Sequence, residues 1–249
     1  MSLLKTIINI AAPVPEIESF DRYLFIGPHP DDLEIAAGAT IAKLADMGKK
    51  ICILICIDGR FGTANSDYSP EEMIEIRKKE SMASANYLGV KDVRFLGFCD
   101  GGLYEYENLT DAIAKEIGDF KPDIVFCPDP DVVNECHIDH LNVGRAVKTI
   151  AYLAPYYNLM REHGAESADV KAIGFFYTGK PNKFVKVKGY LDKQLSSIFD
   201  CHVSQAPRGS EDEKTFTTYI KLKYYYYGCK EGFRVLGRTQ MHCLPEAGN

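Results

Sequence analysis

Short apolar runs alternate along the chain with longer stretches in which apolar residues recur every three or four positions. The short runs have the length and composition of buried strands, and they span residues 23–27, 51–57, 93–98 and 123–127. The helical spacing covers about 35–48, 70–88 and 109–120, and a stretch that begins within 137–140 and ends near 153. This alternation predicts an α/β fold: a Rossmann-like, mostly parallel sheet with right-handed crossovers and helices on both faces.

Local signals support two of these elements. The run at 51–57 is apolar on both faces, which indicates a central parallel strand. Ser69 is the expected N-cap of the helix at 70–88, because a serine side chain accepts a free backbone N–H of the first turn. Pro70 suits the first helical position, where no backbone N–H is needed.

The pattern is less regular in the second half of the chain. We expect a strand near 175–177, helices over about 190–199 and 211–226, a mobile loop over 200–211, and a short strand near 233–236. No composition break divides the chain, so we expect one domain over 1–249. Within it, residues 1–20 are a lead-in segment and about 156–249 form a C-terminal α+β elaboration.

The composition is that of a globular protein with a sizeable core, because 46% of the residues are apolar and 26% are charged. No apolar stretch approaches the ~18 residues that a membrane span needs. Residues 1–20 lack the pattern of a secretory signal. We therefore expect neither a membrane span nor secretion.

Net charge and cysteine positions further limit the possible partners and the cellular compartment of the protein. The net charge of -6 argues against a nucleic-acid partner, because neutralising phosphates needs clustered Lys and Arg. The one basic cluster, 180–188, alternates with apolar residues and predicts the exposed face of a strand. Four of the eight cysteines lie in or at the ends of predicted core strands: Cys52, Cys56, Cys99 and Cys127. Buried thiols of this kind indicate a reducing compartment, so we expect a cytoplasmic protein.

Two histidine–aspartate clusters follow two of the predicted strands. His29-Pro30-Asp31-Asp32 comes after the strand at 23–27, and His137-Ile138-Asp139-His140 comes after the strand at 123–127. In the doubly wound order 3-2-1-4 these strands are neighbours, and the crevice at their carboxyl ends is where such sheets bind ligands. The clusters are therefore expected to face each other despite their separation in sequence.

Together the clusters predict metal-assisted amide hydrolysis. A catalytic zinc takes three protein ligands and keeps a fourth position for water. The expected ligands are His29, Asp32 and His140, which leaves Asp31 to take a proton from the water. His137 is placed to stabilise the oxyanion or to protonate the leaving amine, and Asp139 to hold an imidazole in the correct tautomer.

Simpler interpretations exist for each histidine. The first cluster alone is typical of a capped turn, and the second alone is typical of a solvated helix start. Only their joint placement favours a site. His163, His202 and His242 have no such context and are expected to be surface or loop histidines. The tyrosine run 224–227 predicts half-buried packing and not a binding platform.

Several motifs along most of the chain resemble those of one family. They are 29–34 with 38–40, the loop 58–62, Arg77 with Glu80, the turn 96–101, the second cluster 137–140, and the weaker segments 202–205 and 231–233. In these motifs the chain resembles the PIG-L or LmbE-like zinc-dependent de-N-acetylases. This family includes deacetylases of N-acetylglucosaminyl groups in glycolipid, mycothiol and bacillithiol synthesis.

The resemblance implies a hydrolase that removes an acetyl group from an N-acetylated sugar of the N-acetylglucosaminyl type. It implies zinc, or another divalent transition metal, as cofactor. By residue, it implies metal binding by His29, Asp32 and His140, Asp31 as general base, His137 as oxyanion or acid group, Asp139 as the partner that orients it, and Arg77 near the substrate sugar. The N-terminal extension and residues 156–171 match no motif of the family, and such loops shape substrate choice.

Two alternatives remain open. An amidase that cleaves a larger acyl conjugate would use the same metal, and a non-catalytic sugar- or metal-binding protein would keep the ligands without turnover. Binding alone does not require Asp31, which argues against the second alternative. The expected partner is a small-molecule N-acetyl sugar, and the sequence is compatible with a homo-oligomer.

Overall fold

The computed structural model describes residues 10–62 and 67–242. Within these residues seven strands form one sheet: β1 (Arg22–Gly27), β2 (Lys50–Ile57), β3 (Asp92–Phe98), β4 (Ile124–Pro128), β5 (Ala172–Phe176), β6 (Lys183–Lys186) and β7 (Lys230–Gly237). The helices are η1 (Ile17–Ser19), α2 (Asp32–Asp46), α3 (Pro70–Leu88), α4 (Tyr106–Phe120), α5 (Ile138–Leu153), α6 (Tyr157–Glu162), α7 (Leu191–Phe199) and α8 (Glu211–Tyr226).

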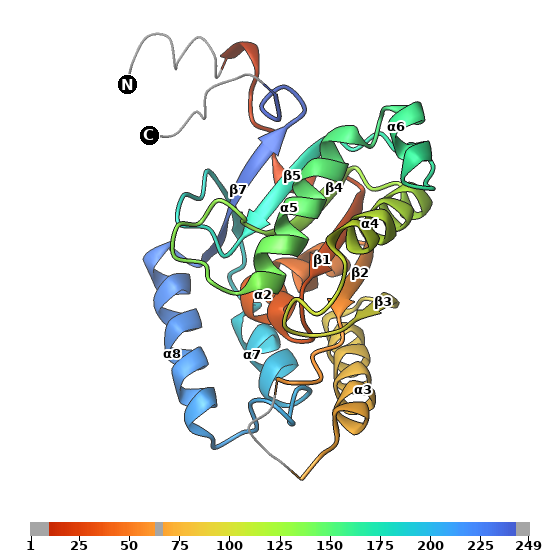
Figure 1. The fold of residues 1–249 in the computed structure, drawn as a ribbon. Coiled ribbons are helices and arrows are strands. Elements are labelled where there is room, and N and C mark those ends of the chain that lie inside the picture. Colours follow the sequence, from red (N-terminus) through yellow and green to blue (C-terminus); the bar gives the residue numbers. More distant parts are fainter. Residues whose placement is uncertain (1–9, 63–66, 243–249) are drawn as a thin grey trace.

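The strands lie in the order β3-β2-β1-β4-β5-β7-β6. All pairings between strands β1 to β5 are parallel. β7 is antiparallel to both of its neighbours, β5 and β6. The predicted order 3-2-1-4 and the mostly parallel α/β fold are therefore confirmed. β1 and β4 are central neighbours (Figure 1), so their carboxyl ends, where such sheets bind ligands, lie in the middle of the sheet.

Helices cover both faces of this sheet (Figure 1). On one face α4 and α5 bury Ile113 and Val147 in a cluster with Leu24 of β1. On the other face α2 buries Leu44 in a cluster with Phe25 of β1. All five side chains are fully buried, and burying one side chain of this size stabilises the fold by about 1.5–3 kcal/mol.

The C-terminal elements continue the sheet and add a flank to it. α7 and α8 share a small core that contains Leu195, Ile198 and Ile220. Gln194 of α7 donates a hydrogen bond to the Glu34 carbonyl of α2, at 2.9 Å. Of the α8 residues only Ile220 and Tyr224 are buried, so most of this helix stands away from the sheet at its side (Figure 1).

Most element boundaries lie close to their predicted positions. Ser69 caps α3 as predicted: its Oγ accepts the Glu72 N–H at 3.2 Å, and the Glu72 carboxylate accepts the Ser69 N–H at 2.8 Å. The strand expected near 175–177 is β5, which ends one residue earlier and begins three residues earlier. α6 was not predicted, because Met160 is its only buried residue and no apolar period marks it.

Other predictions concern local environment. The basic cluster 180–188 contains β6, in which Val185 is buried and Lys186 is exposed, as predicted for one exposed face. Cys52, Cys56 and Cys127 are buried free thiols of the central strands. In the described part of the chain, no helix is long and apolar enough to cross a membrane. Residues 1–9 of the predicted lead-in lie outside the described residues.

Candidate active site

The two histidine–aspartate clusters meet at the carboxyl ends of β1 and β4. His29 lies in the turn from β1 into α2, Asp32 is the first residue of α2, and His140 lies in the first turn of α5. The ring centroids of His29 and His140 are 5.6 Å apart, and His140 Nε2 is 3.4 Å from Asp32 Oδ2. The predicted juxtaposition of the two clusters is therefore confirmed.

Three of these side chains offer a compact set of donor atoms. Asp32 Oδ2 lies 3.2 Å from His29 Nδ1 and 3.4 Å from His140 Nε2, and all three atoms lie within 4.8 Å of one another. Ligand atoms of a tetrahedral divalent ion lie roughly 3.3 Å apart when each bond is about 2.0–2.1 Å long. Two imidazoles and a carboxylate at these separations fit one transition-metal ion.

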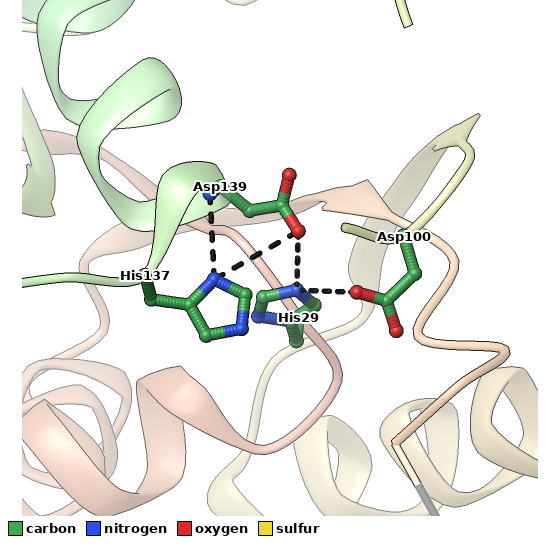
Figure 2. Close-up of side chains that lie close together, drawn as sticks. All are labelled: His29, Asp100, His137 and Asp139. Carbon is green, nitrogen blue, oxygen red and sulfur yellow. Dashed lines mark hydrogen bonds and ion pairs between the residues drawn. The ribbon is translucent and has the colours of Figure 1, made fainter. Parts of the chain in front are cut away.

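Carboxylates lie behind both histidines of this donor set. His29 Nε2 is 3.1 Å from Asp139 Oδ2 and 3.3 Å from Asp100 Oδ1 (Figure 2). His140 Nδ1 is 3.2 Å from Glu135 Oε2. A carboxylate on the far nitrogen fixes the tautomer and orientation of a metal-binding histidine, so this arrangement also fits a metal site.

Figure 2 shows a second group of potential ligands, formed by His29, Asp100, His137 and Asp139. Asp139 is fully buried, and its two oxygens already accept the backbone N–H groups of Gly101 and Gly102, both at 2.9 Å. They also accept the hydroxyl of Tyr104 at 2.8 Å. Because these bonds occupy the carboxylate, Asp139 is better suited to orient His29 than to bind an ion.

Negative charge is concentrated around His29. Burial alone would lower the pKa of this imidazole, but Asp100, Asp139 and Asp32 raise it to about 11. Burial would raise the pKa of Asp32, yet the hydrogen bonds from His140 and His29 hold it well below its ordinary value. Three carboxylates around one imidazole make a place that attracts a cation, whether a proton or a metal ion.

Asp31 stands at the N-cap of α2 with a strained backbone. Its φ of 108° is rare for any residue with a side chain. Such strain persists only where the surroundings hold it, and it is common at functional sites. Burial raises the pKa of Asp31 to about 6, against the opposing charge of Arg77. Its Oδ2 accepts a hydrogen bond from Arg77 Nη2 at 3.0 Å, so the arginine holds the carboxylate in place.

Arg77 is itself clamped by backbone. It is 3% exposed, its Nη1 donates to the Gly59 carbonyl at 2.8 Å, and its Nη2 donates to the Pro30 carbonyl at 2.6 Å. A Cβ atom at Gly59 or Gly62 would overlap the guanidinium, so the loop needs glycine at both positions to wrap it. The role of Arg77 near a substrate sugar stays a prediction, although the residue does line the cavity described next.

His137 caps α5 with its side chain. Its Nδ1 accepts the Asp139 backbone N–H at 3.3 Å, so a neutral His137 carries its proton on Nε2. Burial and the nearby charges of His29 and His140 lower its pKa, which favours this neutral form. The Asp139 carboxylate is 3.8 Å from Nδ1. His137 is therefore a neutral hydrogen-bond donor on the cavity wall.

The site opens into a cavity of about 1020 Å³. The loops that follow β1 to β5 form one wall, and α8 contributes another. The α8 segment lines the cavity with Thr215, Phe216, Tyr219, Lys223 and, just after the helix, Tyr227. A cavity of this size lies at the upper end of the ~300–1,000 Å³ that is usual for small-molecule sites.

Sequence reasoning missed three residues of this site. Asp100 and Glu135 lie behind the histidines, and Tyr177 stacks on His140 with ring centroids 5.7 Å apart. The Tyr177 hydroxyl also lies 3.1 Å from the carbonyl oxygen of Asp32. Asp100 and Glu135 follow the carboxyl ends of predicted strands, and Tyr177 is the last residue of one, so their position at strand ends is the signal that would have found them.

His202 lies in a loop, as predicted, but it is fully buried and not on the surface. Its Nε2 is 3.3 Å from Glu34 Oε1, and this carboxylate raises the pKa of His202 although burial opposes the shift. Two hydrogen bonds from Ser204 to Glu80, both 2.7 Å long, fasten the same loop to α3. These anchors bring Gln205 to the cavity wall.

The sequence and the fold are similar to those of known proteins. Residues 24–151 match the family described as PIG-L, GlcNAc-PI de-N-acetylase. The chain is 34% identical over 236 residues to the diacetylchitobiose deacetylase of Thermococcus kodakarensis, across 91% of this chain and 87% of that protein. It is 31% identical over 209 residues to a probable N-acetyl-alpha-D-glucosaminyl L-malate deacetylase 2 of Bacillus cereus, across 80% of this chain and 88% of that protein. The solved structure of N,N'-diacetylchitobiose deacetylase from Pyrococcus horikoshii matches with a TM-score of 0.88 at 27% identity, over 98% of this chain and 97% of that one.

Fold and site together define a hydrolase of the N-deacetylase class, as predicted. The chain belongs to the PIG-L family of de-N-acetylases, which confirms the resemblance seen in its motifs. The part of the chain that the structure describes includes a histidine–aspartate cluster able to hold a metal ion.

Proposed function

We propose that this protein is a zinc-dependent hydrolase that removes the acetyl group from an N-acetylglucosamine-type sugar. The observation that carries the proposal is the donor set of His29, Asp32 and His140, with a carboxylate behind each histidine. A zinc ion held by two imidazoles and one carboxylate would have room for a water ligand, as in catalytic zinc sites. The substrates named for the Thermococcus and Bacillus relatives support the choice of sugar.

Asp31 carries out both proton transfers in the proposed reaction. A zinc ion held by His29, Asp32 and His140 would lower the pKa of a water ligand toward ~7 and would polarise the amide carbonyl. Asp31 takes the proton of the attacking water and then gives it to the departing amine. Its pKa of about 6 suits both steps near neutral pH. Arg77 keeps the Asp31 carboxylate aimed at the reaction centre.

His137 stabilises the charge that develops on the carbonyl oxygen. As a neutral donor it offers its Nε2–H without a change of protonation state, and one such donor contributes about 10²–10³ to kcat. Asp139 supports this role through its backbone N–H, which bonds His137 Nδ1, and its carboxylate orients His29, one of the proposed metal ligands.

We also propose that the enzyme works in the cytoplasm on a small-molecule sugar. The buried free thiols Cys52, Cys56 and Cys127 support a reducing compartment.

Metal analysis combined with acetate release tests this proposal. The wild-type protein is expected to hold stoichiometric zinc and to release acetate from N-acetylglucosamine conjugates. Asp31→Asn is expected to retain the zinc and to lose activity by about 10²–10⁴-fold. Asp111→Asn is the matched control, because Asp111 lies on α4 and pairs with His163 away from the cavity.

The outcomes separate the alternatives. Loss of zinc in Asp31→Asn would make Asp31 a ligand and contradict the assignment of roles. Release of a larger acyl acid, with no acetate, would indicate an amidase. Retained zinc without any product would indicate a binding protein.

A further inference from the structure

Tyr177 contacts two of the three proposed metal ligands, although the proposed reaction gives it no role. Its hydroxyl oxygen lies 3.2 Å from Asp32 Oδ1 and 3.1 Å from the Asp32 carbonyl oxygen. Its ring is parallel to that of His140 within 3°, with the ring centroids 5.7 Å apart. One side chain therefore contacts both the carboxylate that comes from α2 and the imidazole that comes from α5.

The backbone of Tyr177 is strained in the conformation that makes these contacts. Tyr177 directly follows β5, and its φ of 54° is an outlier for a bulky residue. The fold must hold such a residue in place, and residues of this kind cluster at functional sites. Here the ring packs against Phe176, with centroids 5.2 Å apart, and against the core cluster that contains Phe25 and Leu44. The direction of the hydroxyl is therefore set by the fold.

The two carboxylate oxygens of Asp32 have different partners. Oδ2 accepts the backbone N–H of His29 at 2.9 Å, and it faces His29 Nδ1 at 3.2 Å and His140 Nε2 at 3.4 Å. Oδ1 faces the Tyr177 hydroxyl instead. The donor set therefore offers one oxygen of Asp32 to an ion, and the tyrosine occupies the other.

The proton of the Tyr177 hydroxyl belongs on Oδ1. A tyrosine hydroxyl can donate one hydrogen bond, whereas an ionised carboxylate only accepts. Of the two Asp32 oxygens within reach, Oδ1 is a stronger acceptor than the carbonyl oxygen, because hydrogen bonds to ionised groups are roughly twice as strong as those between neutral groups. Aspartate can bind a cation through one oxygen or through both. A hydrogen bond on Oδ1 opposes binding through both.

We propose that Tyr177 is a positioning residue that makes Asp32 a one-oxygen metal ligand. This inference rests on the proposed function, because it concerns the metal site of that reaction. A second oxygen from Asp32 would take a coordination position that the reaction needs for water or for the amide oxygen. Tyr177 keeps that position open, and it does so through Asp32.

Cobalt(II) is the probe for this inference. Zinc has a filled d shell and gives no visible spectrum, whereas cobalt(II) absorbs strongly in four-coordinate sites and more weakly as the number of ligands rises. Tyr177→Phe removes the hydroxyl and keeps the ring that stacks on His140. In the cobalt-loaded protein this substitution is expected to lower the visible absorption per bound ion, because Oδ1 is then free to bind.

Steady-state kinetics of the zinc-loaded protein give the second readout. Tyr177→Phe is expected to retain zinc and to lose about 10–100-fold in kcat for acetate release, which is the usual effect of removing a hydrogen-bond partner of a metal ligand. The substrate is an N-acetylglucosamine conjugate on which the wild type is active.

Tyr23→Phe is the matched control. It also removes a buried hydroxyl, which donates to the carbonyls of Ile17 and Phe20 away from the cavity. The two variants therefore lose a similar hydrogen bond, and only one of them loses it at the metal site. Tyr23→Phe is expected to keep the cobalt absorption and the kcat of the wild type.

The outcomes separate this inference from the proposed function. A visible absorption in Tyr177→Phe that equals or exceeds that of the wild type would overturn the inference, and so would an unchanged kcat or the same changes in Tyr23→Phe. Acetate release by the wild type would leave the proposed function standing in each case. A wild type that releases no acetate, but whose cobalt absorption falls in Tyr177→Phe, would contradict the proposed function and retain the role of Tyr177. A wild type that takes up neither zinc nor cobalt would overturn both.

Discussion

Replacing Gly59 with alanine tests whether the loop around Arg77 supports catalysis. Gly59 has a φ of 68°, and an added Cβ would lie 2.8 Å from Arg77 Cζ. Gly48 provides a matched control, because its φ of 73° is similar and nothing lies within 4 Å of an added Cβ. The two substitutions therefore impose the same backbone strain, and only one of them disturbs the arginine.

The structure gives the size of the difference. Alanine in the left-handed region costs roughly 1–2 kcal/mol, and both variants carry this cost. The Arg77 guanidinium can move away from a new Cβ only by giving up hydrogen bonds to the Gly59 carbonyl, the Pro30 carbonyl or Asp31. With one charged hydrogen bond lost, at about 1.5–3 kcal/mol, Gly59→Ala is expected to lower the free energy of unfolding by roughly 2.5–5 kcal/mol in total.

Urea unfolding at a fixed zinc concentration measures this difference, since a bound ion shifts the apparent stability. Steady-state kinetics then report on the site. We expect kcat to fall in Gly59→Ala, because Asp31 loses the arginine that aims it, and to change little in Gly48→Ala. Equal losses of stability in the two variants, together with an unchanged kcat in Gly59→Ala, would refute the reasoning.

Two further predictions concern the groups behind the site. Glu135→Gln removes the charge behind His140 and is expected to weaken zinc binding by about 10–100-fold, measured by competition with a chelator; an unchanged affinity would remove Glu135 from the metal site. His202→Ala leaves the buried Glu34 carboxylate without its ion pair and is expected to lower the free energy of unfolding by about 3–5 kcal/mol. His163→Ala breaks a more exposed ion pair and is expected to cost about 0.2–1 kcal/mol, so similar losses in the two variants would contradict the ion-pair argument.

The centre of the sheet could be predicted because each of its strands is a continuous apolar run. In β2 every residue except the first is buried, and the same residues are the apolar ones in the sequence. Once four strands alternate with helices, the handedness of their crossovers leaves few possible orders. The meeting of His29 with His140 followed from that order.

The burial of His202 could not be predicted in the same way. Its partner Glu34 lies on α2, far away in the sequence, and the loop between α7 and α8 has no apolar period that would mark it as packed. Burial there depends on contacts between distant segments, such as the bonds from Ser204 to Glu80 on α3. The α8 wall escaped prediction for a related reason, because helical spacing shows that residues share a face but not what that face meets.

The proposed ligands Asp32 and His140 also bear on how the chain holds together. An ion bound to both would act as a cross-link between the first quarter of the chain and its middle, closing a loop of about one hundred residues. In the chain-entropy treatment of covalent cross-links, a loop of that length corresponds to about 4–5 kcal/mol of stabilisation. The same ion that activates water would then stabilise the contact between the segments that follow β1 and β4. Removing it would lower the stability of the protein as well as abolish its activity.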